Sequence, residues 1–164
     1  MCGILALLNP DSTIVTQPFI KLNQRGPEYT HVDKFNNVIL GFHRLAINGV
    51  DDKSNQPITV DDVVLICNGE IYNYIELKKK IISQFNCKFF TNSDTEVILK
   101  YYKYFGTDCF KEFDGMFAIA IWDPKKEILI LARDRFGEKP LYYSFFENNG
   151  KKQISFSSNL NSLK

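Results

Sequence analysis

The chain has 164 residues, 45% of them hydrophobic and 14% aromatic, which is enough for one domain with a sizeable core. Twenty basic against nineteen acidic side chains give a formal net charge of +1, so no overall charge draws the molecule to nucleic acids or anionic lipid. The longest apolar runs are far shorter than the roughly 20 residues of a membrane helix, and no signal peptide is visible, so we expect a cytoplasmic protein.

Most of the predicted strands are short runs of consecutive apolar residues, which is the pattern of a sheet buried on both faces. In chain order they cover residues 3–8, 38–45, 63–67, 116–122, 127–133, 141–146 and 153–157. Helical periodicity predicts helices over residues 15–24, 74–85 and 97–105, and polar residues 49–57 predict a surface loop. Because strands outnumber helices and the helices are grouped, the pattern favours layered sheets flanked by helices over an alternating parallel fold.

Cys2 stands directly behind the initiator methionine. If Met1 is removed, this one residue carries both a thiol nucleophile and a free α-amine that can act as its base. The other cysteines, Cys67, Cys87 and Cys109, are scattered without CxxC spacing, and the two histidines do not complete a zinc pattern. We therefore expect no metal site, and free thiols in a reducing compartment.

The stretch CNGEIYN follows an apolar run and precedes a predicted helix, which indicates a strand-to-helix corner at Asn68 and Gly69. Asn-Gly is a common turn dipeptide, so a plain turn explains the pair on its own. The alternative is an oxyanion hole, in which the Gly69 backbone N–H and the Asn68 side-chain amide both donate to a developing negative charge. Only the surrounding residues can decide between the two interpretations.

Two further stretches also have both a structural and a functional interpretation. In NSDTEVIL, Ser93 and Glu96 match a capping box, and Asp94 would complement the helix dipole or, if it faces a pocket, pair with a cationic group. Arg44, in GFHRLAI, is either an ordinary solvent-facing arginine on a strand or a buried clamp for a carboxylate. Taken singly, both stretches favour the structural interpretation.

Short motifs occur along the chain in one recognisable order. They are MCGI at the start, RGPE (25–28), HRLAI (43–47), QP (56–57), NGEIYN (68–73), SDTE (93–96), FDGMFA (113–118) and RDRFGEKPLYY (133–143). In this order they resemble the glutaminase domain of glutamine-dependent asparagine synthetases, over essentially the whole chain. Sister families that aminate sugar phosphates or phosphoribosyl pyrophosphate usually read HTRW or HTRY in place of FHRLAI and lack the last motif.

The resemblance implies a class II glutamine amidotransferase domain of the N-terminal-nucleophile hydrolase type over residues 1–164. The implied fold class is α+β, a four-layer αββα sandwich of antiparallel sheets, and the strand count agrees with it. By motif match, Cys2 corresponds to the nucleophile, and Asn68 with the Gly69 N–H corresponds to the oxyanion hole. The implied reaction is hydrolysis of glutamine to glutamate and ammonia through a γ-glutamyl thioester, without a metal or organic cofactor.

The resemblance also implies a substrate-binding set. Arg44 would hold the α-carboxylate of glutamine, while Glu70 and Asp94 would orient its α-amino and amide ends. In this family an ATP-dependent synthetase domain follows, so ATP and Mg would belong to that domain, which the sequence given does not contain. The ammonia would then be used for asparagine synthesis in a synthetase domain or a protein partner.

Other hypotheses remain open at this point. The chain could be a catalytically silent binding or regulatory module that keeps the glutaminase fold, or a truncated fragment of a full asparagine synthetase. A redox or zinc-handling protein is the third class, and the cysteine spacing argues against it. For the glutaminase, we expect an exposed apolar face with contributions from Tyr142, Tyr143, Phe145 or Phe156, where a synthetase partner would dock.

Overall fold

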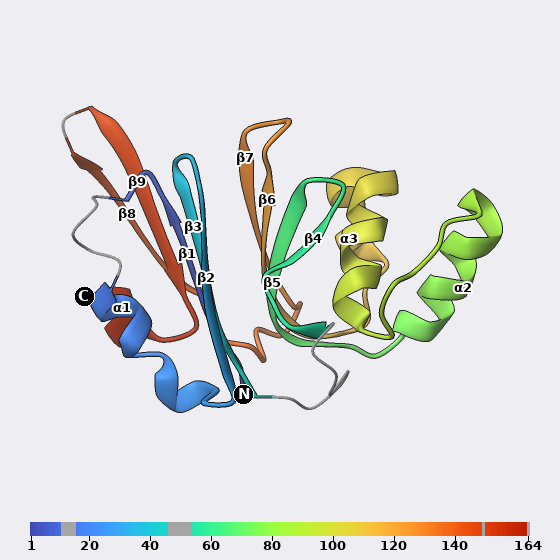
Figure 1. The fold of residues 1–164 in the computed structure, drawn as a ribbon, viewed down its shortest axis with the longest axis horizontal. Helices are drawn as coiled ribbons and strands as arrows, with labels where there is room; N and C mark the ends of the chain where they lie inside the picture. Colours follow the sequence, from blue (N-terminus) through green and yellow to red (C-terminus); the bar gives the residue numbers. More distant parts are fainter. Residues whose placement is uncertain (11–15, 46–53, 149, 164) are drawn as a thin grey trace.

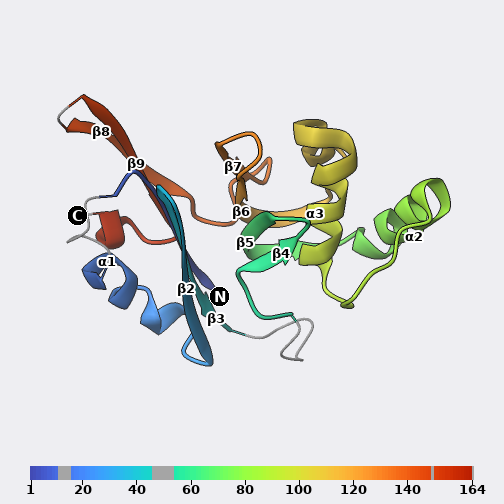
Figure 2. The ribbon, with the colours of Figure 1, turned by 45° about the horizontal axis from the view of Figure 1, so that its top comes forward.

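Two antiparallel sheets face each other, and helices cover their outer faces (Figure 1). The computed structural model describes residues 1–10, 16–45, 54–148 and 150–163. The five-stranded sheet has the order β2-β3-β1-β9-β8, and the four-stranded sheet has the order β4-β5-β6-β7. Figures 1 and 2 both show α1 and α2 on opposite outer sides of the sheet pair, so the predicted four-layer α+β sandwich is confirmed.

The strands and helices have the following bounds. The five-stranded sheet contains β1 (Gly3–Leu8), β2 (Tyr29–Phe35), β3 (Val38–Arg44), β8 (Tyr142–Asn148) and β9 (Lys151–Ser157). The four-stranded sheet contains β4 (Ile58–Val60), β5 (Val63–Ile71), β6 (Gly115–Asp123) and β7 (Ile128–Arg133). The helices are α1 (Thr16–Ile20), α2 (Tyr74–Phe85) and α3 (Asp94–Phe105), and 3-10 turns cover Asn23–Arg25, Gly106–Lys111 and Leu160–Leu163.

Alternate side chains of each central strand enter different apolar layers. On β1, Ile4 and Ala6 pack between the two sheets, while Leu5 and Leu7 pack outward with Leu22 beneath the α1 layer. The central strand β5 divides its side chains in the same way between the inter-sheet layer and the helical layer. Because both faces of these strands are covered, both alternating sets are apolar, which explains the continuous hydrophobic runs in the sequence.

The outer helical layer on the four-stranded sheet is built mainly by α3. Every residue from Asp94 to Tyr102 is buried, because α3 lies between the sheet and α2. The amphipathic helix α2 buries Leu77 and Ile81 in the same apolar layer, and Asn86 caps its C-terminus with a left-handed φ of 48°. The start of α3 is thereby fixed against the end of β5, which is where the candidate site lies.

The structure differs from the sequence prediction at several elements. β2 and β4 were not predicted, and the predicted helix over 15–24 is the short α1 followed by a 3-10 turn, with residue 15 outside the described residues. The predicted surface loop over 49–57 is also wrong at its described end, since Ser54 and Gln56 are buried. Residues 49–53 lie outside the described part of the chain. Finally, β5 continues to Ile71, four residues beyond its predicted end.

Candidate active site

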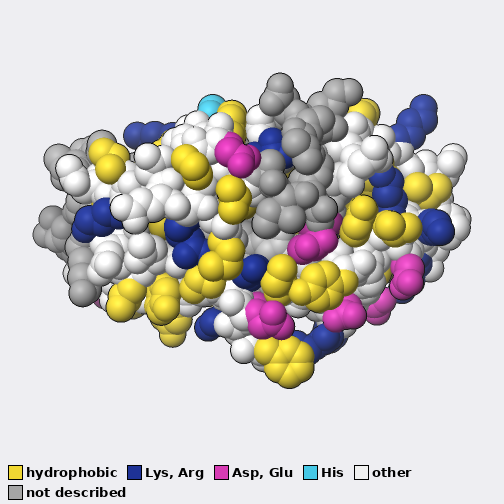
Figure 3. Space-filling model, turned by 90° about the horizontal axis from the view of Figure 1, so that it is seen from below, with side chains coloured by type: hydrophobic (Ala, Val, Ile, Leu, Met, Phe, Trp, Pro, Cys, Tyr) yellow, Lys and Arg dark blue, Asp and Glu magenta, His cyan; other side chains and the backbone are white. Residues whose placement is uncertain are grey.

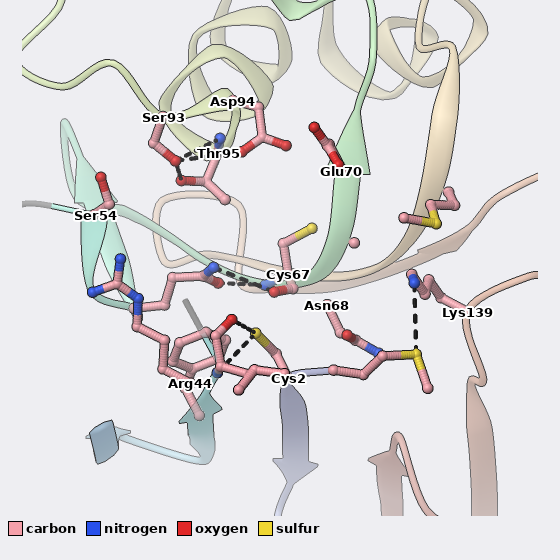
Figure 4. Close-up of a pocket in the computed structure, with 16 residues that line it drawn as sticks. Cys2, Arg44, Ser54, Cys67, Asn68, Glu70, Ser93, Asp94, Thr95 and Lys139 are labelled. Atoms are coloured by element: carbon pink, nitrogen blue, oxygen red, sulfur yellow. Dashed lines mark hydrogen bonds between the residues drawn. The ribbon is translucent and has the colours of Figure 1, made fainter. Parts of the chain in front are cut away.

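A pocket lies where the two sheets meet the start of α3 (Figure 4). It contains all the site residues that the sequence analysis proposed, together with several that it did not. Its described lining consists of Met1, Cys2, Phe42, Arg44, Leu45, Ser54, Gln56, Cys67, Asn68, Gly69, Glu70, Ser93, Asp94, Thr95, Met116 and Lys139. Residues far apart in sequence are thus brought together by the ends of β1, β3 and β5 and by the N-terminus of α3.

Cys2 lies immediately before β1, across the sheet from the end of β3. Its thiol is 3.4 Å from both the carbonyl oxygen and the backbone nitrogen of Leu45, donating to the first and accepting from the second. Burial raises the pKa of this thiol, although the Leu45 N–H and the positive charges of the N-terminus, Arg44 and Arg25 oppose the rise. The thiol is therefore protonated at neutral pH and needs a base to become a nucleophile.

Asn68 and Gly69 lie inside β5, opposite Ala118 and Phe117 of β6, so the predicted strand-to-helix corner is wrong. The corner comes later, after Ile71, because pairing with β6 keeps the chain extended through the Asn-Gly pair. The Asn68 side chain is only 2% exposed, and its Nδ2 has no hydrogen-bond partner among the described residues. Since a buried donor normally finds a partner, the unused hydrogen-bonding capacity of this amide makes it a candidate donor to a ligand.

Gly69 is required by the close approach of β5 and β6. A Cβ at this position would lie 2.1 Å from the carbonyl oxygen of Met116, and φ is +157°. Phe117 of β6 lies opposite Gly69, but its backbone groups point away from β5. Its oxygen accepts from the Asp134 nitrogen, directly after β7, at 2.9 Å. In an antiparallel ladder the N–H of Gly69 then also points away from β6, toward the edge of the sheet beyond the end of β4.

The pocket is lined by charged side chains of both signs, with Lys139 across Cys2 from Arg44. Figure 4 shows Arg44 on one side of Cys2, with Glu70 and Asp94 on the other side of the pocket. Arg44 is buried and donates from Nη1 to Oδ1 of Asn55. Burial raises the pKa of Asp94 and the nearby Glu70 charge adds to this, whereas the Ile71 N–H, 2.9 Å from Asp94 Oδ2, lowers it. This arrangement suits a ligand with a carboxylate at one end and an ammonium group at the other.

The predicted capping box at the start of α3 forms only in part. Ser93 caps the helix by accepting from the Thr95 nitrogen at 3.3 Å. The Glu96 carboxylate, however, accepts from the backbone nitrogens of Phe90 and Thr91 and so holds the loop before the helix rather than the Ser93 N–H. Ser93 also donates from Oγ to Asp94 Oδ1 at 3.4 Å, and Asp94 lines the pocket (Figure 4).

Lys139 and Gln56 are among the pocket residues that were assigned no role from the sequence. Lys139 is buried, with its Nζ 3.6 Å from the sulfur of Met1. Gln56 uses both ends of its side-chain amide to bind the backbone of Cys67. Both belong to motifs that were noted for their order along the chain, but only spatial contacts reveal what their side chains touch. Within the described residues, no cluster of three histidine, cysteine or acidic side chains could hold a metal ion.

Comparison with known proteins identifies the family. The family model described as a glutamine amidotransferase domain matches residues 1–164. The chain belongs to this glutamine amidotransferase family. In solved structures, the glutamine amidotransferase domain resembles glutamine phosphoribosylpyrophosphate amidotransferase from Bacillus subtilis, with a TM-score of 0.77 and 19% identity over 98% of this chain and 42% of that one. This match confirms the N-terminal-nucleophile hydrolase fold.

Several curated relatives of the glutamine amidotransferase domain are named glutamine-hydrolysing asparagine synthetases. The chain is 37% identical to putative asparagine synthetase 2 of Methanocaldococcus jannaschii, over 99% of this chain and 35% of the relative. It is also 37% identical to asparagine synthetase 1 of Bacillus subtilis, over 99% of this chain and 26% of the relative. The probable asparagine synthetase of Schizosaccharomyces pombe is 36% identical, over 99% of this chain and 30% of the relative. The chain thus spans roughly a quarter to a third of the length of these relatives.

The exterior of the glutamine amidotransferase domain carries exposed aromatic side chains. Tyr142, Tyr143 and Phe145 on β8 are exposed as expected, but Phe156 is fully buried between the sheets, so its predicted place on the surface is wrong.

Seen from below (Figure 3), hydrophobic side chains form a broken band along the lower part of the view, interrupted by charged ones. Among the described residues, no helix is long and apolar enough to cross a bilayer.

Proposed function

We propose that this domain hydrolyses glutamine to glutamate and ammonia, with Cys2 as the nucleophile. The observation that carries the proposal is that Cys2 lines the same pocket as Asn68, whose buried Nδ2 has no hydrogen-bond partner among the described residues. A thiol supplies the nucleophile, and an amide donor held ready in a buried site supplies electrostatic stabilisation for an oxyanion. A catalytically silent module would have no need for such a donor.

The proposal requires removal of Met1. While Met1 is attached, the Cys2 nitrogen is a peptide nitrogen and cannot accept a proton. Once it is released, an α-amine with an ordinary pKa of about 8 lies on the same residue as the thiol. Burial raises the pKa of the thiol in the chain that keeps Met1, so attack requires a base, and the amine of the released Cys2 supplies it.

The reaction proceeds in two halves. The α-amine takes the thiol proton as Cys2 Sγ attacks the carboxamide carbon, and the oxyanion is held by Asn68 Nδ2 and the Gly69 N–H. The amine then passes its proton to the amide nitrogen as the C–N bond breaks, so that ammonia leaves and a γ-glutamyl thioester remains. Water attacks the thioester with the amine again as base, which releases glutamate and restores the thiol. No metal or organic cofactor is needed in these steps.

The charged ends of the pocket select the substrate. The buried Arg44 guanidinium would bind the α-carboxylate of glutamine, and the carboxylates of Glu70 and Asp94 would bind its α-ammonium group. Burial of Asp94 supports this role, because an ionised carboxylate in a desolvated site is costly until a cation neutralises it. Free glutamine is therefore favoured over the side chain of a glutamine within a peptide, which lacks both charges.

The relatives' names suggest the fate of the ammonia. We propose that it is used to make asparagine from aspartate, in a synthetase domain of a longer protein or in a separate partner. ATP and Mg would be bound by that synthetase domain. Tyr142, Tyr143 and Phe145 on β8 offer exposed aromatic surface for docking it. The four free thiols fit the cytoplasmic setting that we propose.

A glutamate-release assay tests the proposal. The domain should release glutamate from glutamine, and Cys2→Ala should abolish the release because no other nucleophile replaces the thiol. The matched control is Cys87→Ala, since Cys87 does not line the pocket and is packed in the helical layer. Normal turnover in Cys2→Ala, or equal losses in both variants, would contradict the proposal.

A further inference from the structure

The edge of the four-stranded sheet is closed by a side chain at the point where strand pairing stops. β4 pairs with β5 through Ile58 opposite Leu65 and Thr59 opposite Val64, and two residues before β4 the Gln56 side chain contacts the backbone of Cys67. No strand continues there, because β4 begins at Ile58. The side-chain amide of Gln56 takes the place of the missing backbone pair.

The Gln56 amide reproduces both hydrogen bonds of a strand pair. Its Oε1 accepts from the Cys67 nitrogen at 2.5 Å, and its Nε2 donates to the Cys67 oxygen at 3.2 Å. Gln56 is only 7% exposed and Cys67 only 2%, so water does not replace these bonds readily. Loss of the amide would leave buried backbone groups of β5 unsatisfied directly before Asn68.

The hydrogen bonds between the Gln56 side chain and the Cys67 backbone lie next to both candidate oxyanion donors. In an extended strand, backbone groups two residues apart point to the same edge, so the Cys67 and Gly69 N–H groups face the same side of β5. Gln56 occupies the first of these positions, and the Gly69 N–H is the next donor along that edge. The side chain of Asn68 lies between them on the same strand. The position of both donors therefore depends on where this part of β5 is held.

We propose that Gln56 is a positioning residue for the oxyanion hole, an inference that rests on the function proposed above. Both atoms of its amide are engaged by Cys67, so Gln56 acts through β5. A carboxamide is suited to this position because it offers one donor and one acceptor on a single planar group. In Gln56→Glu, an ionised carboxylate keeps the hydrogen-bond acceptor and loses the donor. In Gln56→Met, the thioether keeps the shape of the side chain and loses both the donor and the acceptor.

The test compares Gln56→Glu and Gln56→Met with Asn73→Asp. Asn73 is a matched control because it is also an amide clamp on the backbone, donating to Glu112 O at 2.9 Å and accepting from Asp114 N at 3.1 Å, and it does not line the pocket. At pH 8 we expect both Gln56 variants to lose kcat for glutamine hydrolysis by roughly ten- to a hundredfold, with KM within about threefold of the parent. Asn73→Asp should keep the parental kcat even where its melting temperature falls.

The pH dependence distinguishes positioning from general loss of structure. When the new carboxyl group in Gln56→Glu is protonated, it again offers one donor and one acceptor to Cys67. The ratio of its kcat to the parental kcat should therefore rise as the pH is lowered from 8 to 5.5, whereas the ratio for Gln56→Met should stay constant. Melting temperatures measured at each pH show that the compared proteins are folded.

The possible failures are separable. If the parent protein releases no glutamate in a Cys2-dependent manner, the proposed function itself is wrong. If the parent is active and either Gln56 variant folds with a parental kcat, the positioning role is wrong while the function stands. A fall in kcat for Asn73→Asp equal to that of the Gln56 variants would also overturn the inference, since it would trace the effect to stability alone.

Discussion

Replacement of Asn68 by leucine separates a catalytic donor from a structural one. The Nδ2 of Asn68 is buried without a partner among the described residues, and an unsatisfied buried polar group costs about 1–3 kcal/mol of stability. Leucine has the same branched shape without the polar atoms, so Asn68→Leu removes this cost and adds apolar burial. Its larger methyl groups introduce some overpacking, which offsets the gain by about 1–3 kcal/mol. We therefore expect a free energy of unfolding within about 1 kcal/mol of the parent.

The same substitution should be severe for catalysis. Loss of one donor from an oxyanion hole lowers kcat by about 10²–10³, equivalent to about 2.7–4 kcal/mol of transition-state stabilisation. Urea unfolding followed by the fluorescence of Trp122, the single tryptophan of the chain, gives the stability. A coupled glutamate-release assay gives kcat.

Asn73→Leu is the control, and it should show the opposite pattern. Its amide makes two hydrogen bonds to the backbone, so its loss should cost about 1–3 kcal/mol of stability while kcat stays near the parental value. An Asn68→Leu variant that is strongly destabilised yet turns over glutamine at the parental rate would refute the assignment of Asn68 to the oxyanion hole.

Three further substitutions test the rest of the site. Arg44→Ala should raise KM for glutamine by roughly 10- to 150-fold, from the loss of a charged hydrogen bond worth about 1.5–3 kcal/mol, and an unchanged KM would reduce Arg44 to a structural residue. Asp94→Asn should raise KM similarly. Since burial raises the pKa of Asp94 in the folded state, ionisation of Asp94 costs stability as pH rises above about 4, so this variant should gain stability relative to the parent between pH 4 and 7 in urea unfolding. Gly69→Ala places a methyl group 2.1 Å from Met116 O and should cost about 1–3 kcal/mol of stability together with most of kcat; wild-type behaviour in both assays would show that the β5–β6 contact is not needed.

Local sequence patterns predicted the elements that are buried on one or both faces. β1 and α2 have the predicted bounds, because the spacing of their apolar residues matches the faces that are buried in the structure. β2 was missed because it is largely exposed and rich in polar residues, and it is held in the sheet by pairing with β3. β4 was missed because it has only three residues, too few to establish a period.

Apart from Cys2, whose position behind Met1 already indicated a nucleophile, the site residues could be named from the sequence only through the order of their motifs. Each stretch alone favoured a structural interpretation, and part of that interpretation is correct, since Ser93 does cap α3 and Gly69 is required by packing. What no local pattern contains is the register between distant strands. That register keeps Asn68 in β5 opposite β6, and the fold also brings the Gln56 side chain to the backbone of Cys67.

The central claim is that a released N-terminal Cys2 forms the thioester with glutamine. The most direct measurement is mass spectrometry of the domain quenched in acid during turnover, with peptide mapping of the N-terminus. We expect the active protein to begin at Cys2 and a fraction of it to carry a γ-glutamyl group on that residue. Full activity in protein that retains Met1, or a γ-glutamyl group on Cys67 instead, would contradict the account.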